Sequence, residues 1–340
     1  MFTIIQHRRR HVCESEQILT KKGMEIIFLD AQMGYDYLQR DDHLRHMNAL
    51  DYSIRMRMSI SLNNYEEMRD RYRLFLKNQC LNWYASERYA FLRIIQEIES
   101  LISHSLPGLL PSRVTMIKTT GKQEFGALYT SREALVLPRV EVVSGVILRF
   151  FPPAHRNMLK VLAHEMFHIF SFLNPDRRKK LYRIIGFEIA ESVQLHPNLD
   201  RLRINNPDTH DIIPLIQVSN RETGRPFTAA LLTISRYPEF VLGKKHLRQY
   251  AIARLFEMKC VNGVWQNVVS KEGCIKGYRF DDVSGFYEQV GTNTDYLIHP
   301  DEILAENVAI ILMGKSKSDN IVTNRLNKSI LRKITSIINA

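Results

Sequence analysis

The stretch AHRNMLKVLAHEMFHIFSF, residues 154–172, decides the fold. Its apolar residues recur at helical spacing, and Asn174-Pro175, one residue beyond its end, would end a helix. His164 and His168 lie four residues apart, so both imidazoles project from one helix face and can reach a single zinc ion. Glu165 lies on the adjacent flank, where a carboxylate can hold and deprotonate a zinc-bound water. The stretch therefore predicts a largely buried helix that carries a zinc site.

A second motif lies in a helix that is predicted to begin at Pro300 and to end near Met313, because Pro is favoured at a first helical position. This helix contains EILAE at residues 302–306. The two motifs together resemble those of gluzincin-type zinc metallopeptidases. The segment GTNTDYLIHPDEILAENVA, residues 291–309, is also similar to the third-ligand region of poorly characterised bacterial members of that group. A metzincin-type site is excluded, because Ser171 and Asn174 stand where that motif has its Gly and its last His.

The resemblance implies a metal centre and a reaction. Glu302 would be the third ligand of one Zn²⁺ per chain, and the small Ala305 would let the two helices pack closely. Glu306, one helical turn later, would accept a hydrogen bond from the second nitrogen of a ligand histidine and fix its tautomer. Glu165 would serve as base and then as acid in the hydrolysis of peptide bonds of a protein or peptide substrate. We therefore expect a zinc-dependent endopeptidase.

The third ligand stays open on the sequence alone, because Glu302 follows His168 at a long interval for this clan. Glu188, Glu191 and His196 lie nearer along the chain. Asp295 is a further alternative, since GTNTD at 291–295 partly matches the motif of the Asp-zincins. With Glu302 as the ligand, an inserted sheet or subdomain has to fill the interval.

Two other sets of residues are weaker candidates. Peptide hydrolysis develops an oxyanion, which a Tyr or His near the metal can stabilise. Tyr287, Tyr296 and His299 precede the Glu302 helix and are the candidates for this role. The run Asn205-Asn206-Pro207-Asp208 is first a turn signal and otherwise a rim of the cleft.

The expected fold class is α+β, with a zincin-like core made of a small sheet and the active-site helix. Three parts are predicted: a helical N-terminal region at 1–110, a catalytic domain at 111–316 with an insertion at about 186–298, and a C-terminal helical tail at 317–340. Expected helices outside the motifs cover 65–79, 86–105 with Ser86 as its N-cap, 176–184 and 322–338. Expected strands cover Arg113–Lys118, Ala134–Leu137, Val146–Phe150, Ile212–Val218 and Ala229–Ile234.

Composition limits the class of protein. The 340 residues are 45% hydrophobic and 24% charged, which excludes a disordered chain. The net charge of +11 favours anionic partners, an acidic substrate included.

An alternative function is a basic regulator that binds nucleic acid or protein through a structural zinc. This alternative is disfavoured, because a structural zinc needs four protein ligands and the sequence offers no obvious fourth.

The sequence also bears on location. No run approaches the 18 apolar residues of a membrane-spanning helix, and residues 1–17 lack the apolar core of a Sec signal peptide. Two expectations remain: the protein is cytoplasmic, or it is secreted without such a signal, for example into a host cell.

Overall fold

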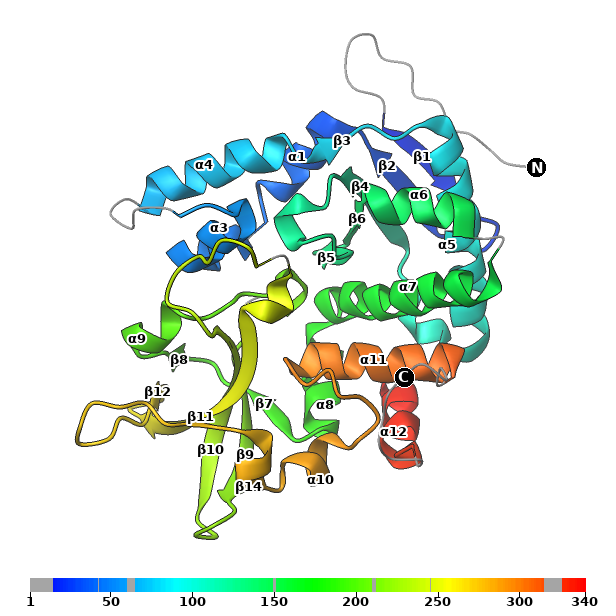
Figure 1. The fold of residues 1–340 in the computed structure, drawn as a ribbon. Helices are drawn as coiled ribbons and strands as arrows, with labels where there is room; N and C mark the ends of the chain where they lie inside the picture. Colours follow the sequence, from blue (N-terminus) through cyan, green and yellow to red (C-terminus); the bar gives the residue numbers. More distant parts are fainter. Residues whose placement is uncertain are drawn as a thin grey trace.

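The computed structural model describes residues 15–41, 43–59, 65–148, 151–209, 212–244, 246–314 and 326–340. The chain has an α+β fold with two sheets, and the motif helix runs between the first sheet and a second long helix (Figure 1). Residues 1–14, most of the N-terminal segment expected to lack a signal peptide, lie outside the described residues, as do the first residues of the helix expected at 322–338. In the described part of the chain, no helix is both long and apolar enough to span a membrane.

The first sheet has the strand order β1-β2-β4-β6-β5, and β3 also pairs with β4. Strands β2, β4 and β6 are parallel, whereas β1, β3 and β5 are antiparallel to their neighbours. The bounds are β1 Glu16–Leu19, β2 Glu25–Leu29, β3 Cys80–Leu81, β4 Arg113–Thr119, β5 Tyr129–Ser131 and β6 Ala134–Pro138.

The expectation of a helical region at 1–110 needs correction, because β1, β2 and β3 belong to this sheet. Strand β2 pairs with β4 from Glu25 opposite Arg113 to Leu29 opposite Ile117. This pairing joins segments far apart in the sequence, so local pattern does not predict it. The sheet therefore crosses the expected boundary at residue 110.

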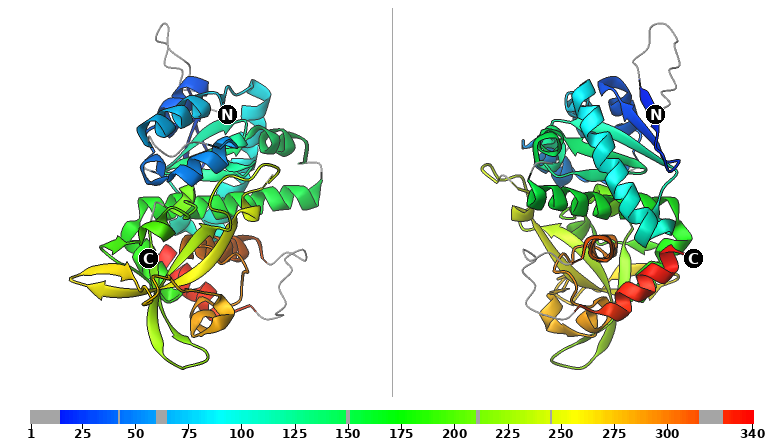
Figure 2. Two further views of the ribbon diagram at one scale, coloured as in Figure 1. Left: turned by 60° about the vertical axis from the view of Figure 1, so that its left-hand side comes forward. Right: turned by 90° about the vertical axis from the view of Figure 1, so that its right-hand side faces the viewer.

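Helices cover both faces of the first sheet (Figure 2). Side chains alternate between the two faces of a strand, so each strand contributes residues to the cores on both sides. In β4, Val114 and Met116 join the core with α5 and α7, while Ile117 joins a second core with α1–α4. The bounds of these helices are α1 Ala31–Leu38, α2 His43–His46, α3 Ala49–Met56, α4 Tyr65–Lys77, α5 Ala85–Ser105 and α7 Pro152–Leu173.

Two local expectations were wrong. Residues 146–148 lie in helix α6 (Arg139–Leu148) instead of a strand, and 149–150 are outside the described residues. Helix α6 packs against β4, β6 and α5 and buries Val142, so tertiary packing overrides the β propensity of this Val-rich run. Ser86 does not cap α5: that helix begins one residue earlier, and Glu87 accepts a hydrogen bond from the backbone N–H of Tyr84 at 2.9 Å.

The second sheet lies within the stretch expected to be an insertion. Its order is β14-β9-β10-β11-β12-β8, with β7 paired to β9 and β13 to β11. The strand bounds are β7 Phe187–Ile189, β8 Val193–Gln194, β9 Pro214–Asn220, β10 Pro226–Ser235, β11 Ala251–Val261, β12 Val264–Asn267, β13 Gly277–Tyr278 and β14 Val283–Ser284. Between β8 and β9 the chain forms α9 (Pro197–Asp200) and the short 3-10 helix η3 (Pro207–Thr209). Two further helices flank this sheet in the chain: α8 (Pro175–Ile184) and α10 (Phe286–Val290).

Helix α11 (Pro300–Met313) packs along α7 and places the two motifs side by side (Figure 1). Phe167 of α7 and Ala305 of α11 are fully buried in the same core. The Ser171 hydroxyl donates a hydrogen bond to Asp301 Oδ1 at 2.8 Å and links the two helices directly. The last helix, α12 (Lys328–Ile338), packs against α8 and α11. One core thus joins the first sheet, the second sheet and both motif helices.

We predict that Ala305→Leu lowers the free energy of unfolding by about 1–3 kcal/mol, because a fully buried site has no room for a larger side chain. Urea denaturation measures the loss. The control is Met313→Leu at the half-buried end of the same helix, which should cost less than ~1.5 kcal/mol. If Ala305→Leu lowers the free energy of unfolding no more than the control does, the two helices are not closely packed at this position.

Candidate metal centre

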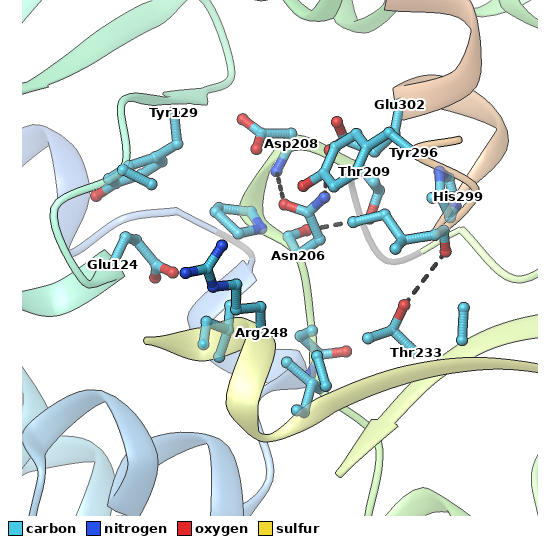
Figure 3. Close-up of a pocket in the computed structure, with 18 of the residues that line it drawn as sticks. Glu124, Tyr129, Asn206, Asp208, Thr209, Thr233, Arg248, Tyr296, His299 and Glu302 are labelled. Carbon is cyan, nitrogen blue, oxygen red and sulfur yellow. Dashed lines mark hydrogen bonds between the residues drawn. The ribbon is translucent and has the colours of Figure 1, made fainter. Parts of the chain in front are cut away.

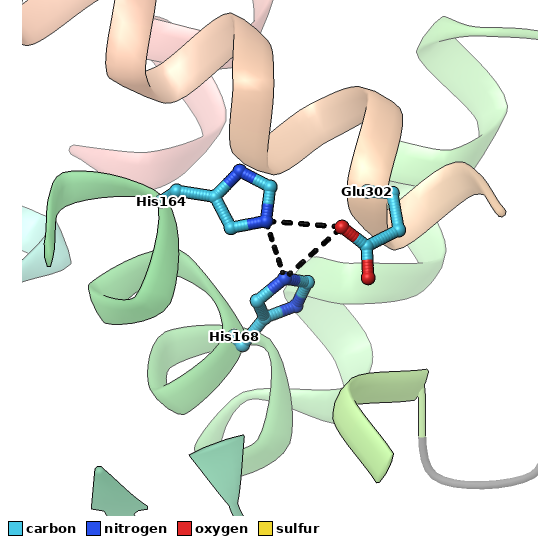
Figure 4. A group of neighbouring side chains, drawn as sticks. All are labelled: His164, His168 and Glu302. Carbon is cyan, nitrogen blue, oxygen red and sulfur yellow. Dashed lines mark hydrogen bonds and ion pairs between the residues drawn. The ribbon is translucent and has the colours of Figure 1, made fainter. Parts of the chain in front are cut away.

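Three side chains from α7 and α11 bring their potential ligand atoms to one point (Figure 4). His164 Nε2 lies 3.0 Å from Glu302 Oε2 and 3.0 Å from His168 Nε2. His168 Nε2 lies 3.7 Å from Glu302 Oε2. The helical spacing of the two histidines sets their positions, and the packing of α11 on α7 brings up the carboxylate.

These separations suit a zinc ion. Two ligand atoms of a tetrahedral zinc lie roughly 3.3 Å apart, because each bond measures about 2.0–2.2 Å. A triangle with the measured sides has a circumradius of about 1.9 Å, slightly shorter than such a bond. One ion just above the plane of the three atoms can therefore contact all of them.

Glu165 is held beside this group. With His168 and Asp208 it forms a second set of potential ligand atoms, all within 4.8 Å of one another. Burial, followed by the negative charge of Asp208, raises the pKa of Glu165 well above its usual value. Glu165 Oε2 is buried and has no hydrogen-bond partner among the described residues. A buried carboxylate oxygen without a partner is costly, and a water bound to an ion in the first group would satisfy it.

The pKa shifts show how strongly these groups interact. Burial lowers the pKa of both histidines, but hydrogen bonds to Glu302 and Glu306 raise the pKa of His164 well above 6.5. The charge of Glu302 likewise outweighs burial and raises the pKa of His168 to about 9. Burial raises the pKa of Glu302, yet the charge of His168 lowers it well below 4.5. A divalent cation at this point would supply the positive charge that the histidine protons otherwise supply.

The hydrogen bond that was expected between Glu306 and a histidine of the motif is present. His164 Nδ1 lies 3.1 Å from Glu306 Oε1, and Lys160 Nζ lies 3.5 Å from the other oxygen of this carboxylate. If Nδ1 carries the proton, Nε2 is left free to bind a metal. His168 differs, because its Nδ1 is buried and has no partner in the part of the chain that the structure describes.

The alternative third ligands lie elsewhere. Glu188 is exposed and pairs with Arg183 at 3.1 Å, and Glu191 and Asp295 are exposed. His196 caps α9, since its Nδ1 accepts from the backbone N–H of Asn198 at 3.2 Å. Only Glu302 of these residues belongs to the group formed with His164 and His168.

The three oxyanion candidates have different surroundings. The rings of Tyr296 and His164 are 6.4 Å apart, and the charge of Glu302 raises the pKa of Tyr296 well above 10, so its hydroxyl keeps a proton to donate. Tyr287 packs against Phe280 and Phe286 instead. His299 is the N-cap of α11, and both of its ring nitrogens already have backbone partners. Tyr296 therefore remains the candidate that faces the metal centre.

A cavity of about 660 Å³ opens beside the metal centre (Figure 3). The second sheet contributes an apolar wall to this cavity, with Leu231, Leu232, Ile252 and Ala253. Its other lining residues include Glu165, Asn206, Asp208, Arg248, Tyr296 and Glu302. The turn at residues 205–208 thus does line the cleft. The sequence contained that turn signal, but nothing in it indicated that Asn206 and Asp208 reach the metal centre.

We predict that the cap of α11 weakens in acid. His299 Nδ1 accepts from the Asp301 N–H at 3.2 Å, Nε2 donates to the Ile212 carbonyl at 3.0 Å, and burial lowers the pKa of His299 below its usual 6.5. The folded protein then binds fewer protons at this residue than the unfolded chain does. The stability that His299 contributes is present above about pH 6.5 and is lost as the pH falls below it.

The test compares His299→Asn with the parent chain, because Asn keeps a capping acceptor and does not titrate. Urea denaturation between about pH 7 and pH 5, with a chelator present to remove metal effects, should show a smaller loss in the variant. His104→Asn, at an exposed position, is the control and should behave like the parent. Equal losses in the parent chain and His299→Asn would contradict the prediction.

Comparison of the chain with protein-family models, with curated proteins and with solved structures finds no significant match. No family is assigned to the chain on this basis. Its function is inferred from the side chains of the metal centre themselves.

Proposed function

We propose that the chain is a zinc-dependent endopeptidase that hydrolyses peptide bonds of a protein substrate. The observation that carries the proposal is the triangle of His164, His168 and Glu302, with Glu165 Oε2 beside it, which is buried and has no partner among the described residues. Three ligands leave one position open, which is the arrangement of a catalytic zinc and not of a structural one. A mixed sheet followed by the motif helix is also the order expected of a zincin-like core.

The chemistry follows from the roles of these side chains. When bound, zinc polarises the scissile carbonyl and lowers the pKa of water. Glu165 accepts a proton from the attacking water on its carboxylate and then delivers that proton to the nitrogen of the leaving amine. The Tyr296 hydroxyl donates a hydrogen bond to the oxygen that becomes negatively charged. The cavity supports a peptide substrate, since its apolar wall suits an apolar side chain near the bond that is cleaved.

We predict that the purified chain binds one zinc ion. Zinc should raise its thermal stability, because a ligand that binds only the folded state stabilises that state. Elemental analysis and thermal unfolding with and without chelator measure both effects. Less than one tenth of a zinc per chain after incubation with zinc salt would contradict the proposal.

The same measurements distinguish the proposed zinc ligands from carboxylates that do not contact the ion. His168→Ala and Glu302→Ala should abolish stoichiometric binding, whereas Glu306→Ala should weaken affinity by only ~10–100-fold, because it contacts a ligand and not the ion. Glu188→Ala is the control, since this carboxylate is exposed and pairs with Arg183. Loss of zinc in the Glu188 variant, or its retention in the Glu302 variant, would contradict the ligand assignment.

We predict that Glu165→Gln binds zinc normally and loses peptide hydrolysis by at least ~10²–10⁴-fold, as expected when a general base is removed. A peptide library derived from whole-proteome digests, read by mass spectrometry, detects cleavage whatever the natural substrate is. Glu188→Gln makes the same chemical change at an exposed site and should cleave like the parent chain. Near-parental cleavage by Glu165→Gln would show that another group is the base.

A further inference from the structure

The insertion between the two motifs returns to the metal centre through the loop that precedes β9. The amide nitrogen Nδ2 of Asn206 donates a hydrogen bond to Glu302 Oε1 (Figure 3). The other oxygen, Glu302 Oε2, faces His164 and His168. The two oxygens of this carboxylate therefore have different partners.

Because its two oxygens have different partners, the Glu302 carboxylate is restricted in how it can bind an ion. A carboxylate can rotate, and it can offer one or both oxygens to a cation. An amide NH₂ group is purely a donor, so it holds one oxygen and leaves the other free to bind the ion. Such partners of metal ligands orient the ligand and tune its affinity.

The Asn206 side chain is itself held in place. Its Oδ1 accepts from the backbone N–H of Asp208 at 3.2 Å, which fixes the amide so that Nδ2 points to Glu302. Asp208 Oδ1 in turn accepts from the backbone N–H and the hydroxyl of Thr130 in β5, at 2.6 and 2.8 Å. The loop is thereby attached to the edge of the first sheet.

The neighbouring residue attaches the same loop to α3. The backbone N–H of Asn205 lies 3.2 Å from Asp51 Oδ1, and the Arg55 guanidinium donates to the Asn205 carbonyl. Arg55 is fully buried and pairs with Asp51 at 2.6 Å and with Glu124 at 2.7 Å. A buried ion pair of this kind is strongly destabilising to break, so the loop has little freedom to move.

We propose that Asn206 is a positioning residue of the metal centre: it holds Glu302 Oε1 so that Oε2 alone is presented to the ion. This proposal rests on the zinc site proposed above and extends it to a residue of the insertion. The insertion thus completes the metal centre that the two helices begin.

Zinc affinity, measured by competition with a chromogenic chelator, tests this role without any assay of hydrolysis. Asn206→Ala should weaken zinc binding by ~10–100-fold. Asn206→Asp has nearly the same shape but places an acceptor against Glu302, so it should weaken binding at least as much. Asn198→Ala, in α9 of the same insertion and exposed, is the control and should bind like the parent chain. Thermal unfolding in chelator verifies that each variant is folded.

A double-mutant cycle and a spectroscopic readout distinguish positioning from a general effect on the fold. If Asn206 acts through Glu302, Asn206→Ala should have no further effect on the weak zinc binding that the two histidines retain in a Glu302→Ala background, measured with zinc in large excess over protein. The Co²⁺-substituted Asn206→Ala protein should have an altered visible absorption spectrum, because the geometry of the ligands changes. Parental zinc affinity and an unchanged Co²⁺ spectrum in folded Asn206→Ala overturn this proposal and leave the zinc site intact. Failure of the parent chain to bind zinc overturns both proposals.

Discussion

The close contact between α7 and α11 is the constraint on which the rest of the structure depends. The two histidines, one helical turn apart, offer two of the three potential ligand atoms of the candidate metal centre, and Glu302 reaches them because α11 lies along α7. The small Ala305 and the hydrogen bond from Ser171 to Asp301 favour this arrangement from within the core. The core that buries the two helices also includes residues of both sheets, so both sheets help to hold the candidate metal centre in place.

The candidate metal centre gathers several buried charges, so its side chains have to be held in defined positions. Glu165, Asp208 and Glu302 are three buried carboxylates that lie close to His164 and His168. Like charges repel strongly in a medium of low dielectric constant, so such a group is stable only if cations or protons offset it. Cations also offset buried carboxylates beside the loop at residues 205–208, where Arg55 pairs with both Asp51 and Glu124.

Features that depend on local sequence pattern could be predicted from the sequence, whereas features that depend on long-range contacts could not. The bounds of α7 and α11 follow from apolar spacing and from Pro residues, and α7 spans Pro152–Leu173 against an expected 154–172. The sequence also predicts a hydrogen bond between Glu306 and one of the two motif histidines, and the structure shows that this histidine is His164. Strand β2 was missed, since Glu25–Leu29 becomes a strand by pairing with β4. Asn206 was identified only as part of a turn, because its contact with Glu302 exists solely in the folded chain.

The long interval between His168 and Glu302 has a consequence for biosynthesis. A ribosome adds about 5–20 residues per second, so the two histidines leave it roughly ten seconds before Glu302, the proposed third ligand. Until α11 emerges and docks, the nascent chain carries a two-histidine helix and cannot form the complete centre. Any activity that needs all three proposed ligands therefore has to wait until the second sheet and α11 have been synthesised.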